Sequence, residues 1–131
     1  MLSACEPNEG VAITDAWARA NAPGQKVGAA YMTLLSTQDS TMIKAEADIA
    51  GSVEIHSMNM ENGVMKMRML EELPLKADKA EKLAPGGFHL MLFDLKKPLT
   101  AGENVNFTLS FKDATGNITK QQIALPIKAA E

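Results

Sequence analysis

Turn-forming residues recur along this chain and divide it into short segments with the character of strands. The clearest turns each contain glycine: Pro23-Gly24, Asn62-Gly63, Pro85-Gly86-Gly87, Ala101-Gly102 and Thr115-Gly116-Asn117. The runs between the turns are β-prone or alternate in polarity, and they predict strands over Val11–Ala20, Val27–Ser36, Met42–Ile49, Val53–Met60, Val64–Leu70, Phe88–Leu95, Val105–Phe111 and Ile118–Ile127. A helical turn is expected only at Asp78–Leu83, between two prolines. The pattern predicts an all-β fold, an antiparallel sandwich or barrel.

Length and charge narrow the class of protein. With 131 residues, the chain is expected to form one domain at residues 11–131, preceded by a tether at residues 1–10. The net charge of -3 gives no basic face for nucleic acid, and no apolar run is long enough to cross a bilayer. Because the sequence offers no convincing Ser-His-Asp set, carboxylate pair or phosphate-binding loop, it does not predict an enzyme.

The single cysteine, Cys5, excludes an intrachain disulfide and a thiolate-cluster metal site. It ends the sequence Leu2-Ser3-Ala4-Cys5, which resembles the end of a bacterial lipoprotein signal, where the cysteine is lipidated. This resemblance predicts a lipid anchor through Cys5. The alternative interpretation is an unmodified cysteine in an N-terminal tail.

Asn62-Gly63 is the most informative turn, because this pair is preferred in two-residue type I′ hairpins, where both residues need a positive φ. Closing the hairpin there gives three cross-strand pairs on one face: Met60 with Met65, Met58 with Met67, and His56 with Met69. The other face is polar and is expected to be solvated; it carries Ser57, Asn59, Lys66 and Arg68. His56 and Met67 become diagonal neighbours, within reach of one ion.

A second pair of candidate ligands lies downstream. His89 and Met91 are separated by one residue in a predicted strand, so they share a face, while Leu90 and Leu92 point into the core. The chain has two histidines, His56 and His89, and each is followed by methionine two residues later. A histidine near an apolar strand is more often structural than a ligand, but two matching contexts weaken that alternative.

Together, His56, Met67, His89 and Met91 would supply two imidazole nitrogens and two thioether sulfurs. Thioether sulfur disfavours zinc and hard ions, whereas imidazole with thioether suits Cu(I). Catalytic zinc usually recruits a third nitrogen or a carboxylate, and a blue-copper centre needs a cysteine thiolate. The four residues therefore predict a site for one Cu(I) ion. Since all four ligands are neutral, the site is suited to a copper carrier.

The other methionines of the hairpin have three open interpretations. They could be alternative ligands, a path that guides copper to the site, or an apolar wall that shields Cu(I) and contacts a partner; the wall is favoured. These residues are Met58, Met60, Met65 and Met69.

Several segments around these residues match one family. They are Asp15-Ala16-Trp17-Ala18-Arg19, Gly28-Ala29-Ala30-Tyr31, Asn62-Gly63-Val64-Met65, Pro85-Gly86-Gly87-Phe88-His89-Leu90-Met91-Leu92 and Leu95-Lys96-Lys97-Pro98-Leu99. With the spacing of the four candidate ligands, they resemble periplasmic copper chaperones of the PCuAC type, from about Val11 to about Ile127. The resemblance implies a cupredoxin-like Greek-key β-sandwich, periplasmic or membrane-anchored, that binds Cu(I) through His56, Met67, His89 and Met91.

The same resemblance implies a partner. Members of this family are linked to copper delivery to the CuA centre of cytochrome c oxidase, so the acceptor would be the CuA subunit or a Sco-type chaperone. The family's usual histidine- and methionine-rich C-terminal tail is missing after Lys128, so a second copper site of that kind is not expected. One alternative is a structural or adhesive immunoglobulin-like module without metal, in which His56 and His89 are buried and far apart. Another is a copper storage or resistance protein with no dedicated partner.

Overall fold

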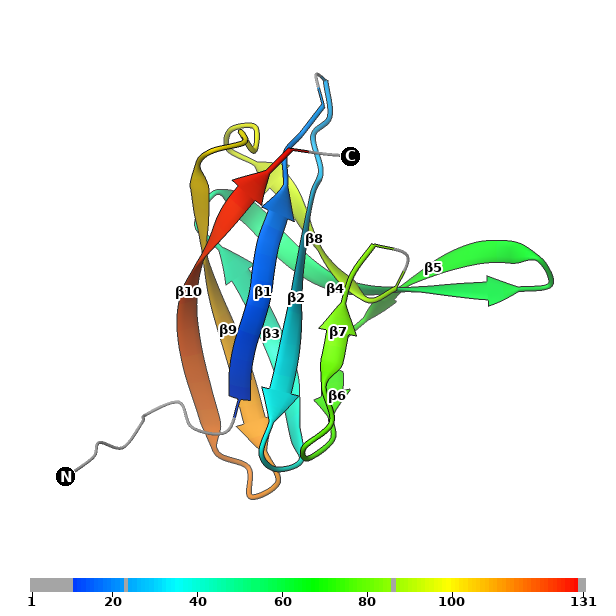
Figure 1. Cartoon of the computed structure of the whole chain (residues 1–131), viewed down its shortest axis with the longest axis vertical. Coiled ribbons are helices and arrows are strands. Elements are labelled where there is room, and N and C mark those ends of the chain that lie inside the picture. The colour runs from blue at the N-terminus through cyan, green and yellow to red at the C-terminus, as the bar shows by residue number, and fades with distance from the viewer. Residues whose placement is uncertain (1–10, 23, 86, 130–131) are drawn as a thin grey trace.

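The computed structural model describes residues 11–22, 24–85 and 87–129. Cys5 and the predicted tether lie outside these described residues. No helix within the described ranges has the length and apolar character needed to cross a membrane. In these ranges the regular elements are strands (Figure 1): β1 (Val11–Arg19), β2 (Gly28–Ser36), β3 (Ser40–Ala47), β4 (Ala50–Glu61), β5 (Val64–Leu70), β6 (Leu73–Leu75), β7 (Glu81–Leu83), β8 (His89–Leu95), β9 (Asn104–Asp113) and β10 (Ile118–Lys128).

The strands follow one continuous hydrogen-bonded order, β5-β4-β8-β2-β1-β10-β9-β3-β6, with β7 beside β2. This order bends into two layers that meet where β1 pairs with β10 (Figure 1). The β1–β10 pair is parallel, with Ala18 opposite Ile127 and Arg19 opposite Lys128, whereas the neighbouring strand pairs are antiparallel. The predicted all-β fold is therefore confirmed, but its sheet is mixed. The first and last strands run side by side in the same direction, which a chain of hairpins alone would not give.

The core lies between the two layers and is filled by alternate residues of each strand. Strand β9 is the clearest case, because Val105, Phe107, Leu109 and Phe111 are all buried while most of the residues between them are not. Side chains on a strand point alternately to its two faces, so this period of two directs one face of β9 into the core.

Two short strands, β6 and β7, were not expected from the sequence. The helical turn predicted at Asp78–Leu83 is wrong, because Glu81–Leu83 is strand β7. Its residue Leu83 is 2% exposed and lies opposite Met32 of β2. A pairing between residues so far apart in sequence overrides the weak local preference for a helical turn.

The hairpin of β4 and β5 has the predicted register, from Glu61 opposite Val64 to His56 opposite Met69. Its turn residues Asn62 and Gly63 have φ values of 53° and 78°, which are the positive values expected for a type I′ turn. Strand β4 also pairs with β8, but the register between them ends at His56. Beyond this point β4 is paired with β5, and the hairpin projects from the body of the sandwich (Figure 1).

Candidate metal site

The two histidines are neighbours on adjacent strands. His56 of β4 lies directly opposite His89 of β8, and the centroids of their rings are 5.7 Å apart. Their chain neighbours Ile55 and Leu90 are buried in the core at 4% and 0% exposure. Because side chains alternate along a strand, both imidazoles lie on the opposite, outer face of this sheet. The structure thus brings together the two histidines that lie 33 positions apart in the sequence.

His89 is buried, with 7% of its surface exposed. Its Nδ1 lies 2.9 Å from the backbone oxygen of Gly87. A carbonyl oxygen can only accept a hydrogen bond, so Nδ1 carries the proton and donates it. In the neutral imidazole the lone pair is then on Nε2, which is the nitrogen available to a metal ion.

His56 is held by a carboxylate on the same strand. Its Nε2 lies 2.9 Å from Oε1 of Glu54, and the side chains are 12% and 40% exposed, respectively. Since a carboxylate accepts the hydrogen bond, Nε2 carries a proton, and the lone pair of the neutral ring is on Nδ1. This Nδ1 is buried and has no hydrogen-bond partner. A buried polar atom without a partner is costly, and a bound metal ion would satisfy it.

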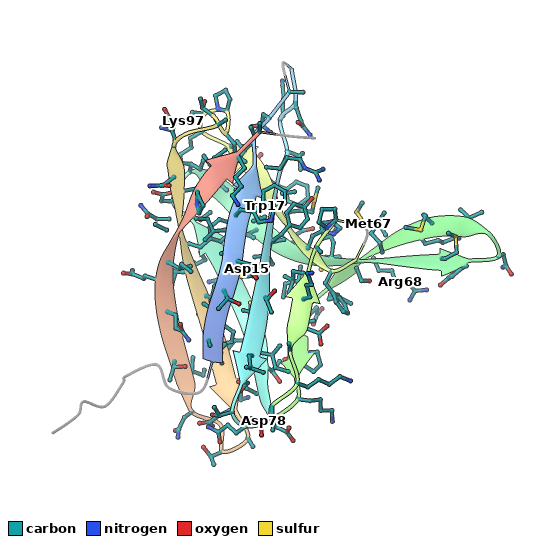
Figure 2. The ribbon with its side chains drawn as sticks, in the orientation of Figure 1. Asp15, Trp17, Met67, Arg68, Asp78 and Lys97 are labelled. Atoms are coloured by element: carbon teal, nitrogen blue, oxygen red, sulfur yellow. The ribbon has the colours of Figure 1, made fainter. Side chains whose placement is uncertain are left out.

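A pocket of about 290 Å³ opens beside His89. Three of the four predicted ligands line it, namely Met67, His89 and Met91, and Met58 lines it as well. The rest of its wall comes from the ends of β1, β2 and nearby loops: Arg19, Ala20, Asn21, Gln25, Val27, Gly28, Ala29, Tyr31 and Pro85. The fourth predicted ligand, His56, is outside the lining but adjacent to it through His89. Figure 2 shows Met67 where the projecting hairpin meets the body.

An aromatic wall supports the pocket on the side away from the hairpin. The ring centroids of Trp17 and Tyr31 are 4.8 Å apart, and those of Tyr31 and His89 are 6.5 Å apart. The guanidinium of Arg19 lies over the Tyr31 ring, 5.4 Å from its centroid. Trp17 (Figure 2) is therefore part of this outer wall. Tyr31 is buried, with its ring close to that of His89.

The methionines of the hairpin share the face predicted for them, and most are exposed. The exposed fractions are 64% for Met60, 46% for Met65, 50% for Met67 and 56% for Met69. On the opposite face, Lys66 and Arg68 are exposed as predicted, whereas Ser57 is only 6% exposed. Ser57 follows His56, where β4 is still close to the body, so the predicted solvated face begins further along the hairpin.

Sequence reasoning missed Glu54 and Tyr31 as parts of this site. Both had a local signal: Glu54 lies two residues before His56, on the same face of a strand, and Tyr31 ends one of the segments shared with PCuAC proteins. What was missing was the pairing of β8 with both β4 and β2, which brings these residues around His89.

The donor atoms at this place have a definite chemical preference. Within the described ranges no three residues drawn from histidine, cysteine, aspartate and glutamate are placed to hold a metal ion. Instead, three methionines, Met58, Met67 and Met91, line the same pocket as His89. Neutral nitrogen and sulfur donors suit a soft, singly charged ion such as Cu(I) better than zinc, magnesium or calcium.

Comparison with known proteins places the chain in a family. The model of the LpqE-like family, described as a lipoprotein family, matches residues 11–123. The chain belongs to the LpqE-like family. It is also 32% identical over 123 residues to Lxx21020 of Leifsonia xyli subsp. xyli (strain CTCB07), a protein whose name presents it as a lipoprotein. That match covers 92% of this chain and 70% of the relative.

The chain is also similar to solved structures of copper-binding proteins. The solution structure of CuI-DR1885 from Deinococcus radiodurans is 31% identical, with a TM-score of 0.67 over 92% of this chain and 81% of that one. The copper-bound PCuAC domain from PmoF2 is 22% identical, with a TM-score of 0.74 over 92% and 94% of the two chains. The resemblance to PCuAC proteins is thus confirmed, and the chain has their cupredoxin-like β fold.

Proposed function

We propose that this protein binds one Cu(I) ion through His56, Met67, His89 and Met91 and passes it to an acceptor by ligand exchange. The observation that carries this proposal is the pocket in which Met67 and Met91 meet His89, with His56 directly opposite His89 on the next strand. Each imidazole has one nitrogen engaged by a protein acceptor, so each keeps the other for a metal ion.

The chemistry of the four residues suits transport of copper. Thioethers are neutral and soft, so they bind Cu(I) without the charged cage that would trap it. Because Met67 is half exposed at the base of the hairpin, the ligands of an acceptor could replace it first. The relation to CuI-DR1885, whose structure is described with Cu(I), supports the same cargo for this chain.

We also propose where the protein acts and which protein receives the copper. The name of the LpqE-like family supports attachment to the bacterial envelope, and we propose a periplasmic protein anchored through Cys5. The proposed acceptor is the CuA subunit of cytochrome c oxidase or a Sco-type chaperone. We propose no catalytic activity, since transfer by ligand exchange changes neither the protein nor the oxidation state of copper.

One alternative is weakened by the geometry. An immunoglobulin-like module without metal would have His56 and His89 far apart, whereas their ring centroids are 5.7 Å apart. A storage or resistance protein would have the same site, so binding alone does not separate it from a chaperone. A transfer assay does: rapid passage of Cu(I) to an apo CuA domain or Sco-type protein supports a chaperone, and retention of the ion supports storage.

The direct test is a titration of Cu(I) against a competing chromogenic chelator. We expect binding of one ion per chain and a loss of affinity of at least about tenfold, or 1.4 kcal/mol, in each of His56→Ala, Met67→Ala, His89→Ala and Met91→Ala. Met65→Ala is the matched control, because Met65 is on the same face of the hairpin but outside the pocket. Affinity that is unchanged in all four variants would contradict the proposal.

A further inference from the structure

We propose that Met58 is a fifth copper ligand, which holds the ion in the pocket until His56 takes its place. This inference rests on the proposed function, because it concerns the same ion and the same pocket. Met58 lies directly opposite Met67 in the hairpin, and both side chains line the pocket with His89 and Met91. Met58 is half-buried, unlike the neighbouring Met60, which is 64% exposed.

The pocket therefore already offers four donors without His56. These are the thioethers of Met58, Met67 and Met91 and the free Nε2 of His89. All are neutral and soft enough for Cu(I), so an ion could be held there by three sulfurs and one nitrogen.

His56 is meanwhile engaged elsewhere. Its Nε2 is hydrogen-bonded to Glu54, and its ring is absent from the lining of the pocket. Only Nδ1 has a free lone pair, and this atom is buried without a partner. An ion that reaches Nδ1 would satisfy it and leave the hydrogen bond to Glu54 intact, so Glu54 acts as a positioning residue.

Copper would move only a short distance between Met58 and His56. Met58 and His56 are two residues apart on β4, so their side chains are on the same face of the strand. The bond from copper to the Met58 sulfur breaks as a bond to the His56 nitrogen forms, while Met67, His89 and Met91 keep the ion. Copper stays Cu(I), and His56 keeps its single proton on Nε2.

The test combines two measurements on the whole chain. Ag(I), a soft ion with the same charge and no redox chemistry under these conditions, is added to protein labelled with 13C at the methionine methyl groups. In the unmodified chain we expect the methyl resonances of Met67 and Met91 to shift strongly and that of Met58 only slightly, whereas in His56→Ala the Met58 resonance should shift as strongly as the other two. The chemical shift of the Met60 methyl group, near the end of the same strand, is expected to remain unchanged.

Cu(I) affinity is then compared in Met58→Leu, His56→Ala and the double variant, with Met60→Leu as the matched control. Leucine keeps the approximate volume of methionine but removes the sulfur, and urea denaturation verifies that each variant is folded. We expect little loss in Met58→Leu alone, because His56 then holds the ion, but a further loss of about threefold to tenfold when Met58→Leu is added to His56→Ala, and no loss from Met60→Leu in either background. The loss in the double variant should exceed the product of the two single losses, because each residue replaces the other when one is removed.

Two results would overturn the inference, and they are distinguishable. If Met58→Leu has no more effect than Met60→Leu, both alone and when combined with His56→Ala, while Met67→Ala still weakens binding, Met58 is not a ligand and the proposed function stands. If neither Cu(I) nor Ag(I) binds the unmodified chain, the proposed function fails and this inference fails with it.

Discussion

The hairpins β4–β5 and β9–β10 are built from the same alternation of residues but are supported in different ways. Strand β9 lies between β10 and β3 and buries large side chains such as Phe107 and Phe111 in the core. The outer half of β4–β5 projects into solvent and leaves Met60 and Met65 exposed. One hairpin therefore holds the fold together, while the other carries the candidate metal site at its base.

The turns of the two hairpins are also stabilised in different ways. In β9–β10, Oδ1 of Asp113 accepts hydrogen bonds from the backbone amides of Thr115 and Asn117, both 3.0 Å long, and from the Thr115 hydroxyl at 2.7 Å. In β4–β5 the turn depends on the positive φ of Asn62 and Gly63. The β9–β10 turn is thus held by side-chain hydrogen bonds, whereas the β4–β5 turn relies on its backbone conformation. We therefore expect substitutions in β9–β10 to change mainly stability, and substitutions in the outer half of β4–β5 to change mainly binding.

The largest expected effect is a loss of stability in the β9–β10 hairpin. Phe107→Ala removes a side chain that is 1% exposed, and we expect the free energy of unfolding to fall by about 3–5 kcal/mol. Met60→Ala removes one that is 64% exposed, and we expect a change within about 0.5 kcal/mol. Urea denaturation followed by circular dichroism measures both. Similar losses in the two variants would show that the projecting hairpin is part of the core.

An intermediate effect is expected from the glycines of the two turns. Gly63 and Gly116 have φ values of 78° and 92°, and an added Cβ would meet no atom within 4 Å at either position. Alanine at either position should therefore cost about 1–2 kcal/mol from backbone strain alone. We expect Gly116→Ala to lower the global stability by this amount.

Gly63→Ala should instead act locally. We expect faster amide hydrogen exchange in β5 and weaker Cu(I) binding, because Met58 and Met67 lose their fixed register, with a smaller change in global unfolding. Native-state hydrogen exchange measures the local and global effects of Gly63→Ala and Gly116→Ala. Equal exchange throughout the chain in the two variants would contradict a local effect of Gly63→Ala.

The smallest expected effect concerns acid and the Asp113 turn. The hydrogen bond from the Thr115 side chain, followed by that from the Asn117 backbone, lowers the pKa of Asp113. A carboxyl with a lowered pKa in the folded state adds stability above the ordinary aspartate pKa of about 3.9, and this contribution is lost as the pH falls through the lowered value. Asp113→Asn should therefore lower the melting temperature at neutral pH, and the difference should shrink in strong acid. A difference that is independent of pH would show that the charge of Asp113 is not involved.

The sequence predicted those parts of the molecule that depend on neighbours along the chain. The register of β4–β5 follows from Asn62-Gly63 and from alternation, and the structure has it residue for residue. The pairs that follow from long-range contacts were beyond such reasoning. Strand β7 exists because it lies beside Met32 of β2, and the parallel contact of β1 with β10 depends on how the whole sheet bends.

The candidate site also has features that the sequence predicts and features that it does not. The four predicted ligands were found from residue types and spacing, and the structure gathers Met67, His89 and Met91 at one pocket with His56 alongside. The hydrogen bond between Glu54 and His56 and the place of Met58 at the pocket depend on side-chain orientation, which spacing does not fix. The sequence placed Met58 and Met60 in one set, whereas in the structure Met58 lines the pocket and Met60 is 64% exposed.

The order of the sheet has a consequence for how copies of this protein behave when crowded. Strand β5 ends that order, and in the described part of the chain it is paired with β4 and with no other strand. Such an edge presents backbone donors and acceptors that could join the edge of a second copy and begin aggregation. Lys66 and Arg68 are exposed along this strand, so two copies in such a pairing would bring like charges together. The positive charges of β5 thus oppose self-association of a hairpin on which Met60, Met65, Met67 and Met69 are exposed.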